Sequence, residues 1–253
     1  MQRDSFLTSR ITDLAMQAYT QHVYTCTRFL TPLEQNDVLS IQKELPVTVR
    51  MTGRADDSAS SIRKIAVFGS EKAFGYEFDN PIRILHIRPK SEKFAEELSH
   101  RDYLGSLMGL GIGRELTGDI VVRGKEAWIF VLDTILPFLC ENLSQVRHTS
   151  VLCEEVSGEI PELIPQFQTM QINTPSERLD VLLAAITGLN RESAKKLLKE
   201  EKVFINGLTA SSAGHKLKPE DEIVVRGSGK YIYDGIVSTT RKGRCNLTVR
   251  KYI

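Results

Sequence analysis

The stretch from residue 81 to residue 156 constrains the fold most strongly, because its apolar segments follow one another in a definite order. Alternating or clustered β-branched residues are typical of strands in IRILHIRP, GDIVVRG, AWIFVL and TSVLCEEV, whereas HRDYLGSLMGL and TILPFLCENLS are typical of helices. In chain order these segments form a βαββαβ unit. Such a unit predicts one four-stranded sheet with two helices on one face.

The βαββαβ order is that of a ferredoxin-like domain, a layout shared by RNA-recognition (RRM) domains and by many proteins that do not bind RNA. RRM domains stack bases on aromatic side chains of the central strands, and the sequence pattern that carries those side chains is absent here. Trp128 and Phe130 do share one face of the strand AWIFVL. We expect them to pack in a core, because aromatics dominate cores; contact with a ligand stays open as the alternative.

Turn-forming residues divide the rest of the chain, which we expect to be an α+β protein of three domains. Residues 1–80 are predicted to form an N-terminal α/β domain, with a helix capped by Thr31 and the strands VTVRM and KIAVFG. Residues 81–156 form the RRM-like domain. Residues 157–173 contain prolines and few periodic apolar positions and are expected to be a linker, after which residues 174–253 form the third domain.

The charge is distributed unevenly along the chain. The net charge is only +1, but residues 175–253 contain 15 Lys and Arg against 9 Asp and Glu, a balance of +6 that leaves −5 for the first 174 residues. A basic region of this kind favours a polyanionic partner such as a nucleic acid. A solvated basic surface is the alternative that charge alone leaves open.

Two short helices are expected to begin the third domain. Thr174 to Glu177 has the sequence of a capping box, which predicts a first helix with a buried leucine stripe and an end at Gly188. Asn190 is then expected to cap a second helix whose apolar residues face inward. Like charges along one helix face cost roughly 0.2–0.5 kcal/mol per pair, a cost that phosphates opposite would offset. The outward cations of the second helix are Arg191, Lys195, Lys196 and Lys199.

The strand KVFING, the turn Asn206-Gly207 and the strand within HKLKPEDEIVV follow these helices. From Arg178 to Ile223 the sequence resembles the S4 RNA-binding domain, whose pattern runs RLDxxL, SRxxAxxLI, GKVxVNG and KPGDxI. The resemblance implies a module of the αL type that binds structured RNA through the outer face of its helices and the following turn. Three residues depart from the pattern, and none of them removes a basic position: Asn190, Glu201 and Glu220.

The S4 resemblance implies that six residues of this chain contact RNA: Arg178, Arg191, Lys195, Lys199, Lys202 and Asn206. Lys196 is added on its charge alone. Such groups on a rigid element follow the phosphate backbone, whereas groups that would read base edges are not evident, so we expect recognition of RNA shape. The tail YDGIVSTTRKGRCNLTVRKYI alternates as a hairpin. Its basic turn either extends the RNA footprint or is a solvated loop, and contains Arg241, Lys242 and Arg244.

The sequence contains fragments of enzyme motifs but no complete one that we recognise. GLGIGRE is spaced GxGxG and follows a helix, unlike the dinucleotide fingerprint, and HRD at residues 100–102 lacks the asparagine of a kinase catalytic loop. The signatures of S4-containing pseudouridine synthases and tyrosyl-tRNA synthetases are also missing, and the histidines and cysteines lack metal-ligand spacing. We therefore expect no catalytic residue, no metal and no cofactor.

Residues 98–122, LSHRDYLGSLMGLGIGRELTGDIVV, together with the βαββαβ order and the S4 pattern, resemble the YlmH family of bacterial S4-domain proteins. The resemblance implies a non-enzymatic factor, encoded among cell-division genes, that acts with tRNA on the large ribosomal subunit in the rescue of stalled translation. Its partners would be rRNA or tRNA, with a possible protein partner for the first two domains, and we expect it in the cytoplasm.

Two alternative functions stay open at the level of the sequence. One is an RNA-modifying enzyme, of the pseudouridine synthase or methyltransferase type, whose catalytic groups lie in the first 155 residues in an unrecognised arrangement. The other is a protein-interaction module of cell division for which RNA binding is incidental.

Overall fold

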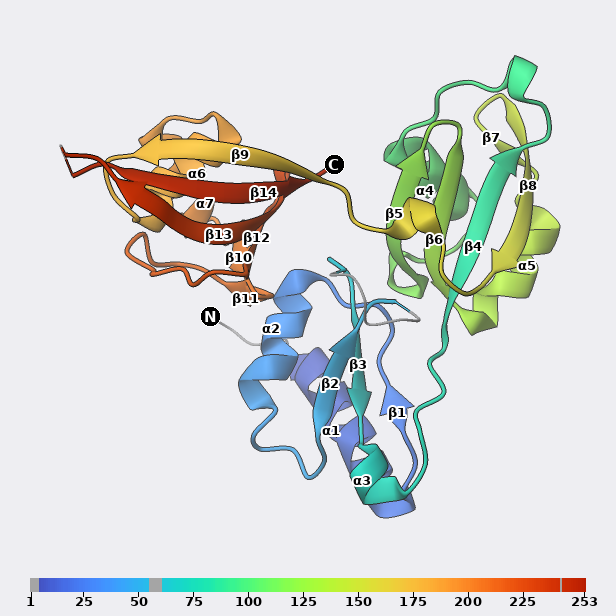
Figure 1. The fold of residues 1–253 in the computed structure, drawn as a ribbon. Coiled ribbons are helices and arrows are strands. Elements are labelled where there is room, and N and C mark those ends of the chain that lie inside the picture. The colour runs from blue at the N-terminus through green and yellow to red at the C-terminus, as the bar shows by residue number, and fades with distance from the viewer. Residues whose placement is uncertain (1–4, 55–60, 242) are drawn as a thin grey trace. The chain divides into compact units, whose positions relative to one another are not determined.

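The computed structural model describes residues 5–54, 61–241 and 243–253. The chain divides into two compact units, Met1–Ile164 and Pro165–Ile253, which we call the N-terminal and C-terminal units. Both combine helices with β-sheets, in agreement with the predicted α+β class (Figure 1). The boundary expected at residue 80 lies inside the first unit, so the regions on either side of it pack together.

The first layer of the N-terminal unit is a small antiparallel sheet with the strand order β1-β3-β2, covered by helices. Ile11, Val38 and Phe68 lie in the core between them. The capping box expected at Thr31 is confirmed, since its backbone N–H donates to the Glu34 carboxylate at 2.6 Å and its hydroxyl accepts the Glu34 N–H at 3.4 Å. The elements are α1 (Ser5–Gln21), β1 (Thr25–Cys26), α2 (Pro32–Ile41), β2 (Val49–Thr52), β3 (Ile65–Phe68) and α3 (Glu71–Phe74).

The second layer is a five-stranded antiparallel sheet with the order β5-β6-β4-β8-β7. Apart from the short β7, this is the strand order of a ferredoxin-like sheet, so the predicted βαββαβ topology is confirmed. Leu107 of α4 and Leu139 of α5 pack with Leu85 and Ile129 of the sheet. The elements are β4 (Ile82–Pro89), α4 (His100–Gly109), β5 (Thr117–Arg123), β6 (Glu126–Leu132), α5 (Leu136–Asn142), β7 (Gln145–Val146) and β8 (Thr149–Val156).

The other face of the second sheet is covered by the first layer. Trp128 and Phe130 lie there, 5% and 1% exposed, in a core that also contains Phe29 and Val67. Gly118 allows this close packing, because a Cβ atom at that position would lie 2.7 Å from the Phe29 ring. The expectation that the two aromatics are core residues is confirmed, and they are not presented for the base stacking that RRM domains use.

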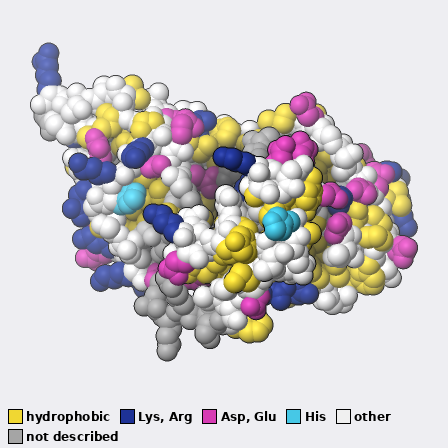
Figure 2. Space-filling model, turned by 90° about the horizontal axis from the view of Figure 1, so that it is seen from below, with side chains coloured by type: hydrophobic (Ala, Val, Ile, Leu, Met, Phe, Trp, Pro, Cys, Tyr) yellow, Lys and Arg dark blue, Asp and Glu magenta, His cyan; other side chains and the backbone are white. Residues whose placement is uncertain are grey.

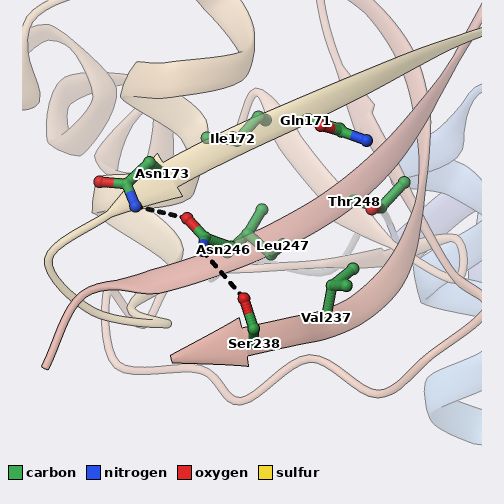
Figure 3. A pocket seen from close by; sticks show the side chains of 8 residues that line it. All are labelled: Gln171, Ile172, Asn173, Val237, Ser238, Asn246, Leu247 and Thr248. Carbon is green, nitrogen blue, oxygen red and sulfur yellow. Dashed lines mark hydrogen bonds between the residues drawn. The ribbon is translucent and has the colours of Figure 1, made fainter. Parts of the chain in front are cut away.

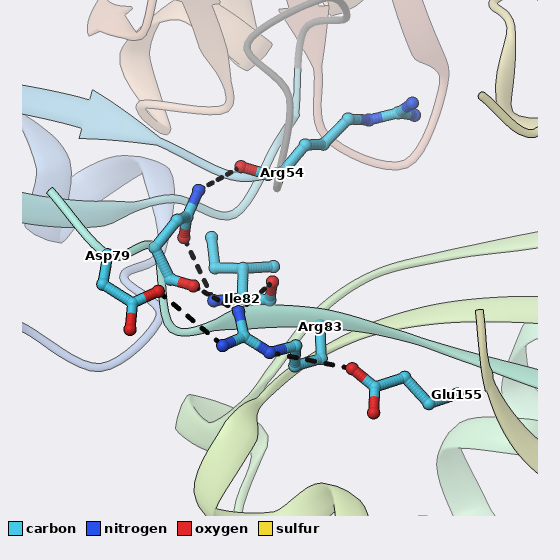
Figure 4. A network of polar contacts seen from close by, with 6 residues as sticks. Arg54, Asp79, Ile82, Arg83 and Glu155 are labelled. Atoms are coloured by element: carbon cyan, nitrogen blue, oxygen red, sulfur yellow. Dashed lines mark hydrogen bonds and ion pairs between the residues drawn. The ribbon is translucent and has the colours of Figure 1, made fainter. Parts of the chain in front are cut away.

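Hydrogen bonds and ion pairs stabilise the segment in which the chain passes from the first layer into β4 (Figure 4). The side-chain amide of Asn80 donates to the Arg54 carbonyl at 2.8 Å. Arg83 of β4 forms ion pairs with Asp79 at 3.8 Å and with Glu155 of β8 at 3.7 Å. Together with the shared core, these contacts explain why the two domains expected on either side of residue 80 form one unit.

The C-terminal unit is a six-stranded antiparallel sheet whose one face is covered by two helices (Figure 1). Leu182, Leu183 and Leu198 of the helices are buried against strand residues such as Ile223 and Val249. The helices are α6 (Leu179–Thr187) and α7 (Arg191–Lys199), and the strands follow across the sheet as β11 (Leu208–Thr209), β10 (Val203–Ile205), β12 (Asp221–Val225), β13 (Gly229–Thr239), β14 (Cys245–Tyr252) and β9 (Phe167–Thr174).

The linker expected at residues 157–173 is wrong for its second half, which belongs to strand β9. This strand pairs with β14 along its whole length, from Phe167 to Thr174. Met170 and Ile172 alternate with polar residues and pack against the core beneath the helices. Two inward-facing apolar positions in a largely polar segment that follows prolines are a weak strand signal, and only the pairing with a distant strand makes them part of the sheet.

The first helix of the C-terminal unit begins later than expected. Thr174 does not cap it, because this residue ends β9 and its backbone is paired with β14. Instead, α6 begins at Leu179 with Arg178 at the N-cap position. The expected end at Gly188 is confirmed, since this glycine has the left-handed conformation (φ 72°) that closes many helices.

Candidate nucleic-acid interface

Helix α7 presents the cationic face that the sequence predicts. Its expected N-cap is confirmed, because the side-chain oxygen of Asn190 accepts the Ser193 N–H at 2.8 Å. Ala194 and Leu198 are buried beneath the helix. The predicted contacts on its outer face are all exposed, namely Arg191, Lys195, Lys196 and Lys199.

A buried carboxylate holds two of the expected RNA contacts. Asp180 has no exposed side-chain surface, and its oxygens accept hydrogen bonds from Nε of Arg178 at 3.0 Å and Nε of Arg191 at 2.8 Å. Burial raises the pKa of the Asp180 carboxyl, but the hydrogen bonds from the two arginines outweigh it, so that the pKa lies below its ordinary value. The arginine side chains are 49% and 52% exposed, which leaves them accessible to a ligand.

The lysines near α7 fall into two pairs. Lys195 and Lys199 are exposed, and neither has an ion-pair partner among the described residues. Lys196 and Lys202 both contact the Glu200 carboxylate, at 3.6 Å and 2.7 Å, and the hydrogen bond from Lys202 lowers the pKa of Glu200. In Figure 2 Lys and Arg side chains gather along one edge of the C-terminal unit, at the left of the view. Glu200 therefore competes with any phosphate for two of the four lysines.

Asn206 is held inside the turn between β10 and β11. Its φ of 50° is left-handed, a conformation that asparagine adopts more readily than most residues. Its amide nitrogen donates to Asp221 at 2.7 Å, and its oxygen accepts the Glu222 N–H at 2.9 Å. The structure thus gives Asn206 a role in shaping the turn, whereas its contact with RNA stays a prediction.

The predicted C-terminal hairpin is confirmed, with β13 and β14 paired up to Thr239 and Cys245 on either side of a turn. Arg241 is exposed in this turn, and Lys242 lies outside the described residues. Arg244 is engaged on the sheet, where its guanidinium donates to the side-chain oxygen and, at 2.9 Å, to the backbone carbonyl of Asn173. Both arginines are thus exposed, but Arg244 is tied to strand β9.

Sequence reasoning missed a basic loop between β11 and β12. Its His215, Lys216 and Lys218 are exposed. The Ala213 carbonyl in this loop accepts the backbone N–H of Asp180 at 3.5 Å, which brings the loop to the start of α6. The run HKLK was the available signal, but nothing local in the sequence indicates that it folds back beside the arginines.

The N-terminal unit carries a charged cluster of mixed sign on its second sheet. His86 stacks on Trp128 with ring centroids 4.7 Å apart, and its Nε2 lies 2.6 Å from the Glu126 carboxylate. Glu154 is paired with Arg88 at 3.2 Å. Carboxylates repel phosphate, so this cluster is a poorer candidate for an RNA contact than the α7 face.

The enzyme-like fragments have structural explanations. The HRD tripeptide opens α4, where Asp102 accepts hydrogen bonds from the Ser99 hydroxyl at 2.7 Å and the Ser99 N–H at 2.8 Å, and these bonds lower the pKa of Asp102. The GLGIGRE segment closes the same helix, with Gly111 in the left-handed region at φ 79°. Among the described residues, no helix combines the length and apolar character needed to cross a membrane.

Comparisons with known proteins match both parts of this arrangement. The family described as "Putative RNA-binding domain in YlmH" matches residues 76–159, and the S4 domain family matches residues 177–223. The chain is 25% identical over 234 residues to "Ribosome-associated protein quality control protein P2" of Bacillus subtilis (strain 168), which covers 91% of this chain and 88% of the relative. The solved structure of "Cell division protein ylmH from Streptococcus pneumoniae" is 22% identical, with a TM-score of 0.48, over 61% of this chain and 91% of that one.

The matched segments coincide with the structural elements that carry the site. The S4 match begins just before Arg178 and ends within β12, so it contains the Asp180 carboxylate and all of α7. The other match spans the whole βαββαβ sheet. The chain thus contains a domain that matches the YlmH RNA-binding domain family, followed by a domain that matches the S4 family.

Proposed function

We propose that this protein is a binding factor that docks through its S4 domain on structured rRNA or tRNA of the large ribosomal subunit and acts in ribosome-associated quality control. The name of the Bacillus subtilis relative supports the link to the ribosome. A factor of this kind works in the cytoplasm. Its N-terminal unit would position the S4 domain or contact a protein partner, which also leaves room for a link to cell division.

The observation that carries this proposal is the arrangement of cations around Asp180. The carboxylate orients Arg178 and Arg191 at the starts of α6 and α7, and Lys195 and Lys199 continue the charge along the outer face of α7. Groups on rigid helices can match the phosphate spacing of a folded RNA without paying a large ordering entropy. Binding through this face would follow RNA shape.

The proposal can be tested by sedimentation of the protein with purified ribosomal subunits. We expect the wild-type protein to sediment with the large subunit, and we expect the double variant Lys195→Ala/Lys199→Ala to lose most of that association. Lys72→Ala is the matched control, because Lys72 is an exposed lysine of α3 in the other unit. Equal association of all three proteins, or association of none, would contradict the proposal.

We further propose that the protein performs no chemistry on its RNA. The matched families and the name of the relative concern RNA binding and quality control. The test is mass-spectrometric analysis of nucleosides from rRNA and tRNA of cells with and without the gene. A modified nucleoside that depends on the protein would favour the RNA-modifying alternative.

A further inference from the structure

We propose that a polar groove on the sheet of the C-terminal unit binds a single-stranded segment of the same RNA that the α7 face holds. The groove has a volume of about 440 Å³ and lies over β9, β14 and β13 (Figure 3). This inference rests on the proposed RNA-binding function and adds a second type of contact to it. The polar residues that line the groove are Gln171, Asn173, Ser238, Asn246 and Thr248.

The groove lies on the sheet face that is turned away from α6 and α7. Along β9 the side chains of Met170 and Ile172 point into the core beneath the helices, so Gln171 and Asn173 point to the opposite face. Strand β13 opens the groove through two register shifts, one between Tyr233 and Gly235 and one between Ile236 and Ser238. Bulges of this kind bend a strand away from its neighbour and often accompany functional sites.

A chain of hydrogen bonds fixes the orientation of the amides in the groove. The Arg244 guanidinium donates to the side-chain oxygen of Asn173, whose amide nitrogen donates to the oxygen of Asn246. The amide nitrogen of Asn246 then donates to the Ser238 hydroxyl at 2.9 Å (Figure 3). A guanidinium has no acceptor, so the oxygen of Asn173 must face Arg244 and each amide after it has only one favourable orientation.

This orientation leaves donors for a ligand. An amide NH₂ group has two hydrogens, and the chain uses one on Asn173 and one on Asn246. Within the described residues, the Gln171 amide and the Thr248 hydroxyl have no hydrogen-bond partner. None of the lining residues is acidic, and Arg244 adds a positive charge at one end. The groove therefore favours an acceptor-rich, anionic chain, which is the chemistry of RNA bases and phosphates.

The groove and the α7 face can engage one RNA molecule. Asn173 is separated from Arg178 by five residue steps, so their Cα atoms are at most about 18 Å apart, a distance that a few nucleotides cover. Side-chain amides can read base edges, whereas the cations of α7 are expected to contact the phosphate backbone. A folded RNA on α7 would thus pass a single-stranded extension along Arg244 into the groove, where the bases are read.

The test compares the affinity of the full-length protein for two RNA probes, a blunt hairpin and the same hairpin with a single-stranded extension. We expect the extension to strengthen binding, and we expect Gln171→Ala or Thr248→Val to weaken binding of the extended hairpin by about fivefold, the effect of one lost hydrogen bond. Binding of the blunt hairpin should be unchanged. Gln168→Ala is the matched control, because Gln168 is exposed on the same strand and points to the other face.

The outcomes separate this inference from the proposed function. If the wild-type protein binds both hairpins equally, or if Gln171→Ala and Gln168→Ala have the same effect on the extended hairpin, the groove does not bind RNA while the α7 face still can. If Lys195→Ala weakens neither hairpin, the proposed function fails. Loss of binding to the extended hairpin alone in both groove variants supports the inference.

Discussion

The Asp180 carboxylate accepts a hydrogen bond from Nε of Arg191 at 2.8 Å, and this contact joins the first turn of α6 to the first residue of α7. The carboxylate is completely buried, whereas the arginine is half exposed. A charge that is buried in this way needs its partners, because an unpaired carboxylate in the interior is strongly unfavourable. The contact therefore couples the stability of the two helices to the position of a cation that faces the solvent.

Replacing Asp180 with asparagine should destabilise the C-terminal unit at neutral pH. We expect the free energy of unfolding to fall by about 1–3 kcal/mol, because two charge-assisted hydrogen bonds are weakened while both arginines stay partly hydrated. Hydrogen exchange of the amides in α6 and α7 measures this change. Glu177→Gln is the control, because Glu177 is an exposed carboxylate three positions earlier and its removal should change stability by less than about 0.5 kcal/mol.

The effect of Asp180→Asn should also depend on pH in one direction. The folded-state pKa of Asp180 is lower than its unfolded value, so the stabilisation is fully present above the unfolded pKa of about 3.9 and is lost as the pH falls through the folded pKa. The difference between wild type and variant should therefore shrink in acid. A difference that stays constant from neutral pH down to the acid transition would show that the carboxylate is not the source of the stability.

The two pairs of lysines should contribute differently to RNA binding. Lys195→Ala should lower the slope of log affinity against log salt by about 1, because one phosphate contact is lost. Lys196→Ala should lower it less, since Lys196 is already close to Glu200. Titrations of a folded tRNA at several salt concentrations measure both slopes. Equal slopes for wild type and Lys195→Ala would show that Lys195 does not contact an RNA phosphate.

Glu200→Gln should strengthen RNA binding. The change removes a negative charge and releases Lys196 and Lys202, which contact this carboxylate at 3.6 Å and 2.7 Å. We expect a gain in affinity of about twofold to tenfold at low salt that disappears at high salt, because the contribution is electrostatic. Glu192→Gln, on the exposed first turn of α7, controls for the change in net charge alone.

Asn206→Ala should affect folding more than RNA binding. The substitution removes the hydrogen bonds to Asp221 and Glu222 and places alanine in a left-handed conformation, so we expect a loss of about 1–3 kcal/mol in unfolding free energy. Asn206→Gly removes the same bonds but accepts the conformation, and should cost less. RNA affinity of the folded variants, measured well below their unfolding temperatures, tests the predicted contact of Asn206 with RNA; an affinity equal to that of the wild type would limit Asn206 to shaping the turn. A large loss of affinity in the glycine variant would make Asn206 a direct contact.

The fluorescence of Trp128 should not change when RNA binds. This residue is the one tryptophan of the chain and is 5% exposed between the two layers of the N-terminal unit. We expect a fluorescence spectrum typical of a buried indole, weak quenching by iodide and no change on addition of tRNA. Strong quenching by RNA would mean that this sheet face becomes accessible when RNA binds, whereas in the structure the first layer covers it.

Local patterns were enough to predict several elements. The capping interactions of Thr31 and Asn190 were predictable because each involves residues only three positions apart. The βαββαβ order was predictable because each apolar segment carries its own period. Strand β9 was not predictable, because its two inward residues become part of a core only after pairing with β14, more than seventy positions later. The same pairing brings Asn173 to Asn246 and creates the groove.

The amino-acid sequence by itself determined where α7 begins, which of its faces is apolar and that lysines and arginines occupy the other face, since helical periodicity is a property of neighbouring residues. Only the tertiary structure decided which of those cations are held, by Asp180 or Glu200, and which have no ion-pair partner among the described residues. It also decided that β9 completes the sheet. The physical reason is that ion pairs and strand pairing depend on distances between residues far apart in the chain, and those distances exist only after the core has formed.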